Sequence, residues 1–186
     1  NAGTYSATAT YAESANYLRS TDTKNFTIAK ATQTITWDNP AKIVYGTALS
    51  GMQLNAEVAG VTGGTAPGAL TYDPAAGTIL AAGSQTLSVT AAATDNYNEA
   101  TKTVTLVVDK APTTTVVTVG NATYDGLPHG GTATVTGANG LNEAVTVMYA
   151  GVSPTVYASS ATAPTNAGTY SATATYAESA NYLGSA

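Results

Sequence analysis

Apolar residues alternate with threonine and serine along most of this chain. A period of two residues is typical of strands with one buried face, because successive side chains of a strand point to opposite sides. The inward positions that the alternation predicts are Tyr5, Ala7, Ala9, Tyr11, Phe26, Ile28, Leu87, Val89, Ala91, Val104, Leu106 and Val108. No segment has the period of a helix. The pattern therefore predicts an all-β protein.

Turn-forming pairs separate these segments. Asn39-Pro40, Gly63-Gly64 and Asn139-Gly140 are examples, and each combines residues that reverse the chain easily. Short strands at this spacing are typical of a β-sandwich. The predicted fold is a tandem series of Ig-like β-sandwich domains, and a β-grasp-like variant remains open.

The chain repeats itself. Residues 1–18, NAGTYSATATYAESANYL, return without a change as residues 166–183. Inside this long period, Asn-Tyr pairs recur at a nearly even spacing, beginning at Asn16, Asn96 and Asn181. A regular spacing of this kind is the sequence signature of a repeat protein.

The repeat predicts three parts. Residues 1–30 are expected to be the C-terminal strands of a preceding repeat, residues 31–110 an Ig-like repeat, and residues 111–186 a second repeat without its last strand. The contacts within two strands alone seldom offset the conformational entropy that the chain loses when the strands become ordered. We therefore expect the segment from Lys24 to Ala31 to add to the open sheet of a neighbouring copy, in a head-to-tail arrangement.

Composition narrows the possible partners. Only 9% of the residues are charged, the net charge is −5 and there is no cysteine. A chain without a basic patch is a poor partner for nucleic acid or anionic lipid, and a chain without thiols forms neither disulfides nor thiolate metal sites. We expect no nucleic-acid binding and no membrane insertion.

Two longer stretches resemble a known family. These are ITWDNPAKIVYGTALSGMQLNA at residues 35–56 and GALTYDPAAGTILAAGSQTLSVTAAATDNYNEATKTVTLVVDKA at residues 68–111. Together they resemble the MBG-type (YGX-variant) Ig-like repeats of very long bacterial surface proteins, although TDNYNEA stands where relatives have a longer aromatic-rich strand. NATYDGLPHGGTATVTGANG at residues 121–140 is similar to a companion (YDG) class. The resemblance implies an extracellular spacer or adhesion repeat without catalytic or metal residues.

Catalytic candidates are few. His129 is the only histidine, and it lies between Pro128 and two glycines with no paired base or further ligand nearby in sequence. We interpret it as a loop residue. No catalytic, cofactor-binding or metal-binding residue is predicted, and the chain is expected not to be an enzyme.

The carboxylates are scattered, at Asp73, Asp95, Glu99, Asp109, Asp125 and Glu143. Calcium held near Asp109 and Asp125 is an alternative to solvated turn residues. Lys30 and Lys110 occupy equivalent strand ends, where cross-links between lysine and asparagine would be an alternative to ordinary surface amines.

The Asn-Tyr pairs have two interpretations. Their rings would either stack on a glycan or pack against the end of a sandwich with the hydroxyl bonded to a turn, and the second is commoner in such folds. Asn25 and Asn121 begin glycosylation patterns, at a frequency that chance explains.

The leading hypothesis is a structural repeat of an extracellular bacterial stalk, fibre or adhesin. The alternative is a glycan- or protein-binding adhesin module that uses loops such as residues 61–68 or 127–131.

Overall fold

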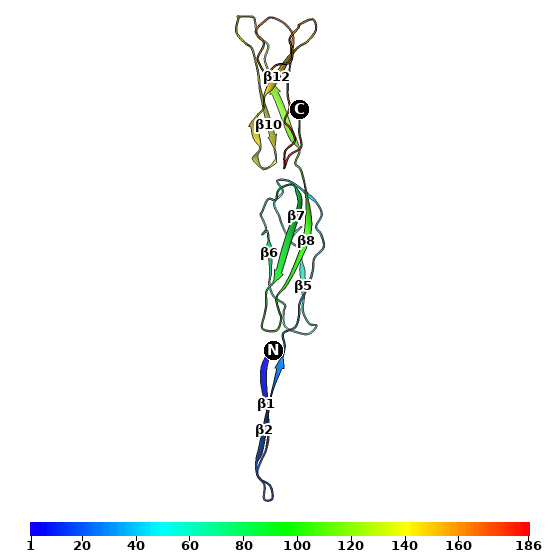
Figure 1. The fold of residues 1–186 in the computed structure, drawn as a ribbon, viewed down its shortest axis with the longest axis vertical. Coiled ribbons are helices and arrows are strands. Elements are labelled where there is room, and N and C mark those ends of the chain that lie inside the picture. Colours follow the sequence, from blue (N-terminus) through cyan, green and yellow to red (C-terminus); the bar gives the residue numbers. More distant parts are fainter. The chain divides into compact units, whose positions relative to one another are not determined.

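The computed structural model describes all 186 residues, and its regular secondary structure is almost wholly β-strand (Figure 1). The strands are β1 (Gly3–Tyr11), β2 (Ser20–Ile28), β3 (Thr34–Thr36), β4 (Ile43–Val44), β5 (Glu57–Ala59), β6 (Leu70–Asp73), β7 (Gly83–Ala91), β8 (Ala100–Asp109), β9 (Thr113–Thr118), β10 (Thr132–Gly137), β11 (Asn142–Ala144), β12 (Val147–Gly151) and β13 (Tyr170–Ala174). The only helical segment is a single 3-10 turn at Ala138–Gly140. The predicted all-β class is confirmed.

The chain forms two compact units. One comprises Asn1–Pro40, Ser50–Gly77 and Thr86–Thr105, and the other comprises Ala41–Leu49, Thr78–Gln85 and Leu106–Ala186. Strands β7 and β8 contribute residues to both. The repeat boundaries predicted after residues 30 and 110 stay a prediction.

The largest sheet has the strand order β4-β8-β7-β6. Strand β6 pairs antiparallel with β7, while the two residues of β4 pair parallel with Val108 and Asp109 of β8. The predicted inward residues of β7 and β8 are all at most 6% exposed, and they are Leu87, Val89, Ala91, Val104, Leu106 and Val108. The alternation is confirmed here, because the alternate residues of each strand are buried and their neighbours are more exposed.

A buried glutamine supports the end of β7. The side-chain nitrogen of Gln33 donates to the carbonyls of Ala91, Ala92 and Asn98 at 2.8 to 3.1 Å, and its oxygen accepts from the amide of Gly68 at 2.8 Å. A Cβ at Gly68 would overlap the carbonyl of Ala92, so only glycine allows this approach. The sequence analysis missed Gln33, which stands alone among the threonines of its segment.

In the second unit, smaller sheets surround a small core. Their strand orders are β11-β10-β9 and β12-β13. The buried core cluster consists of Ala133, Val147, Tyr149 and Ala174. It contains no leucine, isoleucine or phenylalanine, and residues 111–186 hold fewer buried apolar side chains than residues 31–110.

Strands β1 and β2 form a two-stranded antiparallel hairpin, drawn in blue in Figure 1. The register runs from Gly3 opposite Ile28 to Tyr11 opposite Ser20, and every residue of both strands is exposed. The inward positions predicted on β1 and β2 are therefore wrong for the single chain, since Phe26 and Ile28 are 50% and 48% exposed and Tyr5, Ala7, Ala9 and Tyr11 are exposed as well. The reason is that no second layer lies over the hairpin.

Strands β1 and β13 come from the same repeated sequence, yet their lengths differ. GTYSATATY forms nine residues of strand at Gly3–Tyr11, where β2 lies beside it along its whole length. The second copy, at residues 168–176, forms a strand only over Tyr170–Ala174, which pairs with β12, while Tyr176 makes an isolated antiparallel bridge with Ser185. The neighbouring strand, not the sequence, decides how far the ladder extends.

Candidate functional site: the repeat corners and an open strand edge

The Asn-Tyr pair at Asn96 and Tyr97 forms a buried corner, which we call the unit-1 corner. Tyr97 is 1% exposed. Its hydroxyl accepts from the amide of Val61 at 2.9 Å and donates to the carbonyl of Thr65 at 3.2 Å. For Tyr97, the interpretation in which the ring is buried and the hydroxyl bonds a turn is confirmed. The two hydrogen bonds fix residues 61–68, which the sequence analysis suggested as a binding loop.

Asn96 connects this corner to the chain around it. Its backbone carbonyl accepts from the amide of Ala31 at 2.8 Å, and the amide of Asn98 donates to the carbonyl of Ala31 at 2.9 Å. Its side-chain oxygen accepts from the amide of Ala2 at 2.7 Å. One asparagine therefore holds both Ala2, which precedes β1, and Ala31, the first residue of its own predicted repeat.

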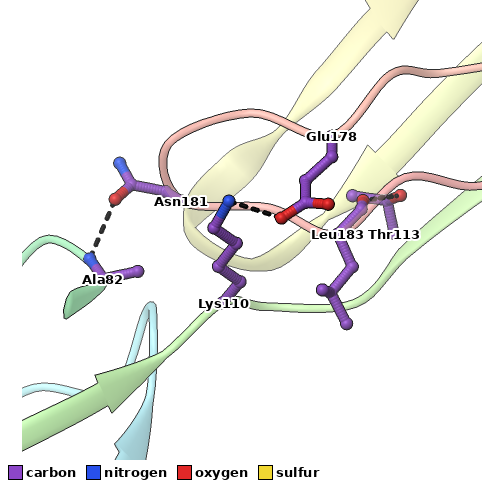
Figure 2. A network of polar contacts seen from close by, with 6 residues as sticks. All are labelled: Ala82, Lys110, Thr113, Glu178, Asn181 and Leu183. Carbon is purple, nitrogen blue, oxygen red and sulfur yellow. Dashed lines mark hydrogen bonds and ion pairs between the residues drawn. The ribbon is translucent and has the colours of Figure 1, made fainter.

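The unit-2 corner, at Asn181 and Tyr182, repeats this arrangement (Figure 2). The amide of Ala111 donates to the carbonyl of Asn181 at 2.9 Å, and the amide of Leu183 donates to the carbonyl of Ala111 at 2.8 Å. Figure 2 shows the Asn181 carboxamide turned toward Ala82, whose amide donates to it at 2.9 Å. Ala82 corresponds to Ala2 in the repeat, so equivalent residues make the same hydrogen bond twice.

Tyr182 completes the unit-2 corner. Its hydroxyl donates to the carbonyl of Ala138 at 2.8 Å, and its ring meets the ring of Tyr45 edge-on at 5.2 Å. Burial, followed by the neighbouring Tyr45, raises the pKa of Tyr182. The side chain of Asn139 donates to the Tyr45 hydroxyl at 3.0 Å. No sequence pattern indicated this last contact, since it joins residues far apart along the chain.

The two equivalent lysines also lie at the corners. Lys30 donates to the carbonyl of Thr94 at 2.5 Å, and Lys110 forms an ion pair of 2.6 Å with Glu178. Neither amine hydrogen bonds an asparagine carboxamide. The structure therefore does not bring together the pair of groups that a lysine-asparagine cross-link needs.

His129 and Asp125 lie together on an exposed loop. The Nε2 atom of His129 is 2.9 Å from a carboxylate oxygen of Asp125, which also accepts from the amide of Leu127 at 2.9 Å. The Leu127 amide is the main cause that lowers the pKa of Asp125, and His129 adds to it. The pair organises its own loop, because the carboxylate binds two residues of the same short segment.

The carboxylates proposed for calcium have other partners. Asp109 forms an ion pair of 2.7 Å with Lys42 and raises the pKa of that amine, while Asp125 binds His129. No group of three histidine, cysteine, aspartate or glutamate side chains comes together as metal ligands. Of the two asparagines in glycosylation patterns, Asn25 lies on exposed strand β2 and Asn121 lines a cavity.

Strand β13 pairs with β12 on one edge, and we call its other edge the open edge. Just beyond β13, Tyr176 pairs antiparallel with Ser185. A cavity of about 410 Å³ lies beside β13. Its lining includes residues 168–172 of the β13 segment and residues 119–122 with Tyr124, and Tyr124 is 63% exposed. The sequence did not indicate this cavity, which forms between segments that are distant along the chain.

Comparisons with known proteins returned no match: no family model, no curated protein and no solved structure resembles this chain at a significant level. The resemblance to MBG-type repeats therefore stays a prediction. No helix has the length and apolar character needed to cross a membrane.

Proposed function

We propose that this chain is a structural repeat segment of a long extracellular bacterial stalk, fibre or adhesin. The observation that carries the proposal is the corner that is built twice. Residues at equivalent places of the repeat make the same set of backbone and side-chain hydrogen bonds at Asn96 and at Asn181. A joint that recurs with the sequence period is what a repeat protein needs to grow by adding units.

The corner gives the chain a mechanical role. Ala31 and Ala111 each follow a lysine. The amide and the carbonyl of each alanine both hydrogen bond the backbone of an Asn-Tyr corner. The amide of Ala2 or Ala82 adds a third connection through the asparagine side chain. Because several hydrogen bonds must break together before the segment can swing away, the joint resists both bending and pulling.

The surface suits exposure outside the cell. With 9% charged residues and outward faces that are largely threonine, solubility depends on hydroxyl groups and not on charge. Such a surface is little affected by ionic strength. In keeping with the resemblance to MBG-type repeats, we propose an Ig-like sandwich, or its β-grasp-like variant, for each repeat.

A second candidate function is a glycan- or protein-binding adhesin module. The cavity beside β13 favours it, because Tyr124 is exposed there and His129 and Asn121 also line it. An aromatic ring beside amide and imidazole groups can bind a sugar. The stalk proposal predicts no such ligand.

Single-molecule pulling on the full chain, combined with a glycan array, tests the proposal. Each repeat holds about 80 residues, so we expect two separate unfolding steps that each lengthen the chain by about 25 to 29 nm. The step for residues 111–186 should occur at the lower force, because its core is the smaller. One step for the whole chain, or a specific glycan bound at micromolar concentration, would overturn the stalk proposal.

A further inference from the structure

Asn139 and Gly140 form the only asparagine-glycine pair of this chain, and they lie in the turn between β10 and β11. We propose that this pair is a site of spontaneous deamidation, and that the contact between Asn139 and Tyr45 restrains the reaction. The inference goes beyond the stalk function, because it concerns a covalent modification of the chain's own residues.

The reaction uses only the chain and water. The backbone nitrogen of Gly140 loses its proton to solvent and attacks Cγ of Asn139, so that a C–N bond forms and the Cγ–Nδ2 bond breaks. The side-chain nitrogen takes up a proton and leaves as ammonia, and a five-membered succinimide ring remains. Water then opens the ring at one of its two carbonyl carbons. Opening at Cγ gives aspartate, and opening at the main-chain carbonyl gives isoaspartate.

The first argument is the residue that follows Asn139. The chain has twelve asparagines, and Asn139 alone is followed by glycine. A Cβ next to the attacking nitrogen crowds the ring closure, and glycine has none. Asn139 and Gly140 are both exposed, and a Cβ placed on Gly140 would meet no atom within 4 Å. Asn139 is therefore the asparagine that should react first.

The second argument is that the folded turn holds the pair in an unreactive conformation. Asn139 has φ 53° and ψ 34°, Gly140 has φ 78°, and the amide of Leu141 donates to the carbonyl of Ala138 at 3.3 Å. Asn-Gly pairs favour turns of this kind, with positive φ at both residues. Ring closure requires the Cβ of Asn139 to lie beside the Gly140 nitrogen about the Cα–C bond. At this ψ the backbone nitrogen of Asn139 lies there instead, so the turn must open before it reacts.

The third argument is that distant residues keep the turn closed. The Asn139 side chain donates to the Tyr45 hydroxyl at 3.0 Å, and the Tyr182 hydroxyl donates to the carbonyl of Ala138 at 2.8 Å. A Cβ at Gly46 would lie 2.9 Å from the Cβ of Ala138, so the loop that carries Tyr45 packs directly on the turn. All these residues belong to one compact unit. Opening the turn disturbs these contacts, so they lower the open population and with it the rate of reaction.

Deamidation changes the contact that restrained it. The product lacks the amino group that donates to Tyr45, and it adds one negative charge to a net charge of −5. Isoaspartate also adds one carbon atom to the main chain within the turn. The modification therefore limits how long the contact between Tyr45 and this turn keeps its original geometry.

Peptide mapping of the full chain, after storage in warm, mildly alkaline buffer, tests the proposal. Digestion at acidic pH stops further reaction, and mass spectrometry then measures the modified fraction at each asparagine. We expect Asn139 to react faster than any other asparagine of the folded chain, and several times more slowly than the same residue in chain unfolded by urea. Reaction at Asn139 that is no faster than elsewhere, or equal rates in folded and unfolded chain, would overturn the proposal.

A substitution tests the role of Tyr45. Tyr45→Phe removes the acceptor of the Asn139 side chain, and it should speed deamidation of the folded chain roughly two- to tenfold, as expected for the loss of one ordinary hydrogen bond. Tyr124→Phe is the matched control, because Tyr124 holds the equivalent place in the second predicted repeat and is 63% exposed. Its rate should equal that of the unsubstituted chain.

Circular dichroism checks that both variants are folded. An unchanged rate in folded Tyr45→Phe would contradict the restraint by Tyr45, and the comparison of folded with unfolded chain needs no variant. The pulling experiment does not depend on the chemistry of Asn139, so the stalk function and the deamidation site can fail separately.

Discussion

At the scale of single residues, the corner tyrosines show how one position acquires different environments. Tyr17 and Tyr97 occupy equivalent places in the repeated sequence. Tyr97 is 1% exposed and its hydroxyl joins two residues of the loop at 61–68, whereas Tyr17 is 69% exposed. The tyrosine is structural only where a loop closes over it.

Tyr97→Phe should lower the free energy of unfolding by about 1 to 3 kcal/mol, because it removes both hydrogen bonds that the Tyr97 hydroxyl makes, with the amide of Val61 and with the carbonyl of Thr65. Chemical denaturation followed by circular dichroism measures the change. The equivalent substitution Tyr17→Phe is the control, with an expected change within about 0.5 kcal/mol. Equal effects of the two substitutions would contradict the structural role of the corner.

Asp125 is the residue whose titration the structure predicts most directly. The Leu127 amide, and then His129, lower its pKa in the folded chain relative to the unfolded chain. A lowered pKa means that the folded loop prefers the carboxylate form. Its contribution to stability is present above the unfolded pKa and is lost as the pH falls through the folded pKa.

NMR titration of the Asp125 carboxyl group should give a midpoint below the ordinary value for aspartate. In the His129→Ala variant the pKa of Asp125 should stay below the ordinary value, because the hydrogen bond from the Leu127 amide is the first cause of the lowering. A return to the ordinary value in that variant would assign the shift to the histidine instead.

At the scale of elements, β2 and β8 have corresponding sequences in different surroundings. Strand β8 lies between β4 and β7 with one face buried, while β2 has only β1 beside it. The same alternation of apolar and polar residues therefore contributes to a core in one case and to exposed surface in the other.

Leu106→Ala should destabilise the chain by about 2 to 5 kcal/mol, since it removes a fully buried side chain and leaves a cavity. Phe26→Ala, at the equivalent position of β2, should cost less than about 0.5 kcal/mol in dilute, monomeric chain. Thermal unfolding of both variants tests this. A large loss from Phe26→Ala would indicate that β2 is already buried against another part of the molecule or another copy.

At the scale of the whole molecule, the chain relies on repetition. It has few charges, no cysteine and no cluster of metal ligands, so its stability depends on apolar faces of strands and on corners that recur with the sequence period. A function that depends on length and continuity is consistent with these features.

The sequence by itself determined the all-β class, the inward faces of β7 and β8 and the repeated Asn-Tyr corners, because these depend on local alternation and on exact repetition. It could not determine the partners of Gln33, Lys42 or Tyr45, since each binds residues far away along the chain and many polar residues would serve equally.

Only the tertiary structure decided which copy of a repeated segment is buried. The sequence GTYSATATY is a nine-residue strand beside β2 and a five-residue strand beside β12, and Phe26 is exposed where Leu106 is buried. The physical reason is that a strand's hydrogen bonds and apolar contacts are made with its neighbours. The amino-acid sequence specifies which face of a strand can be buried, and the neighbouring strands decide whether that face is buried.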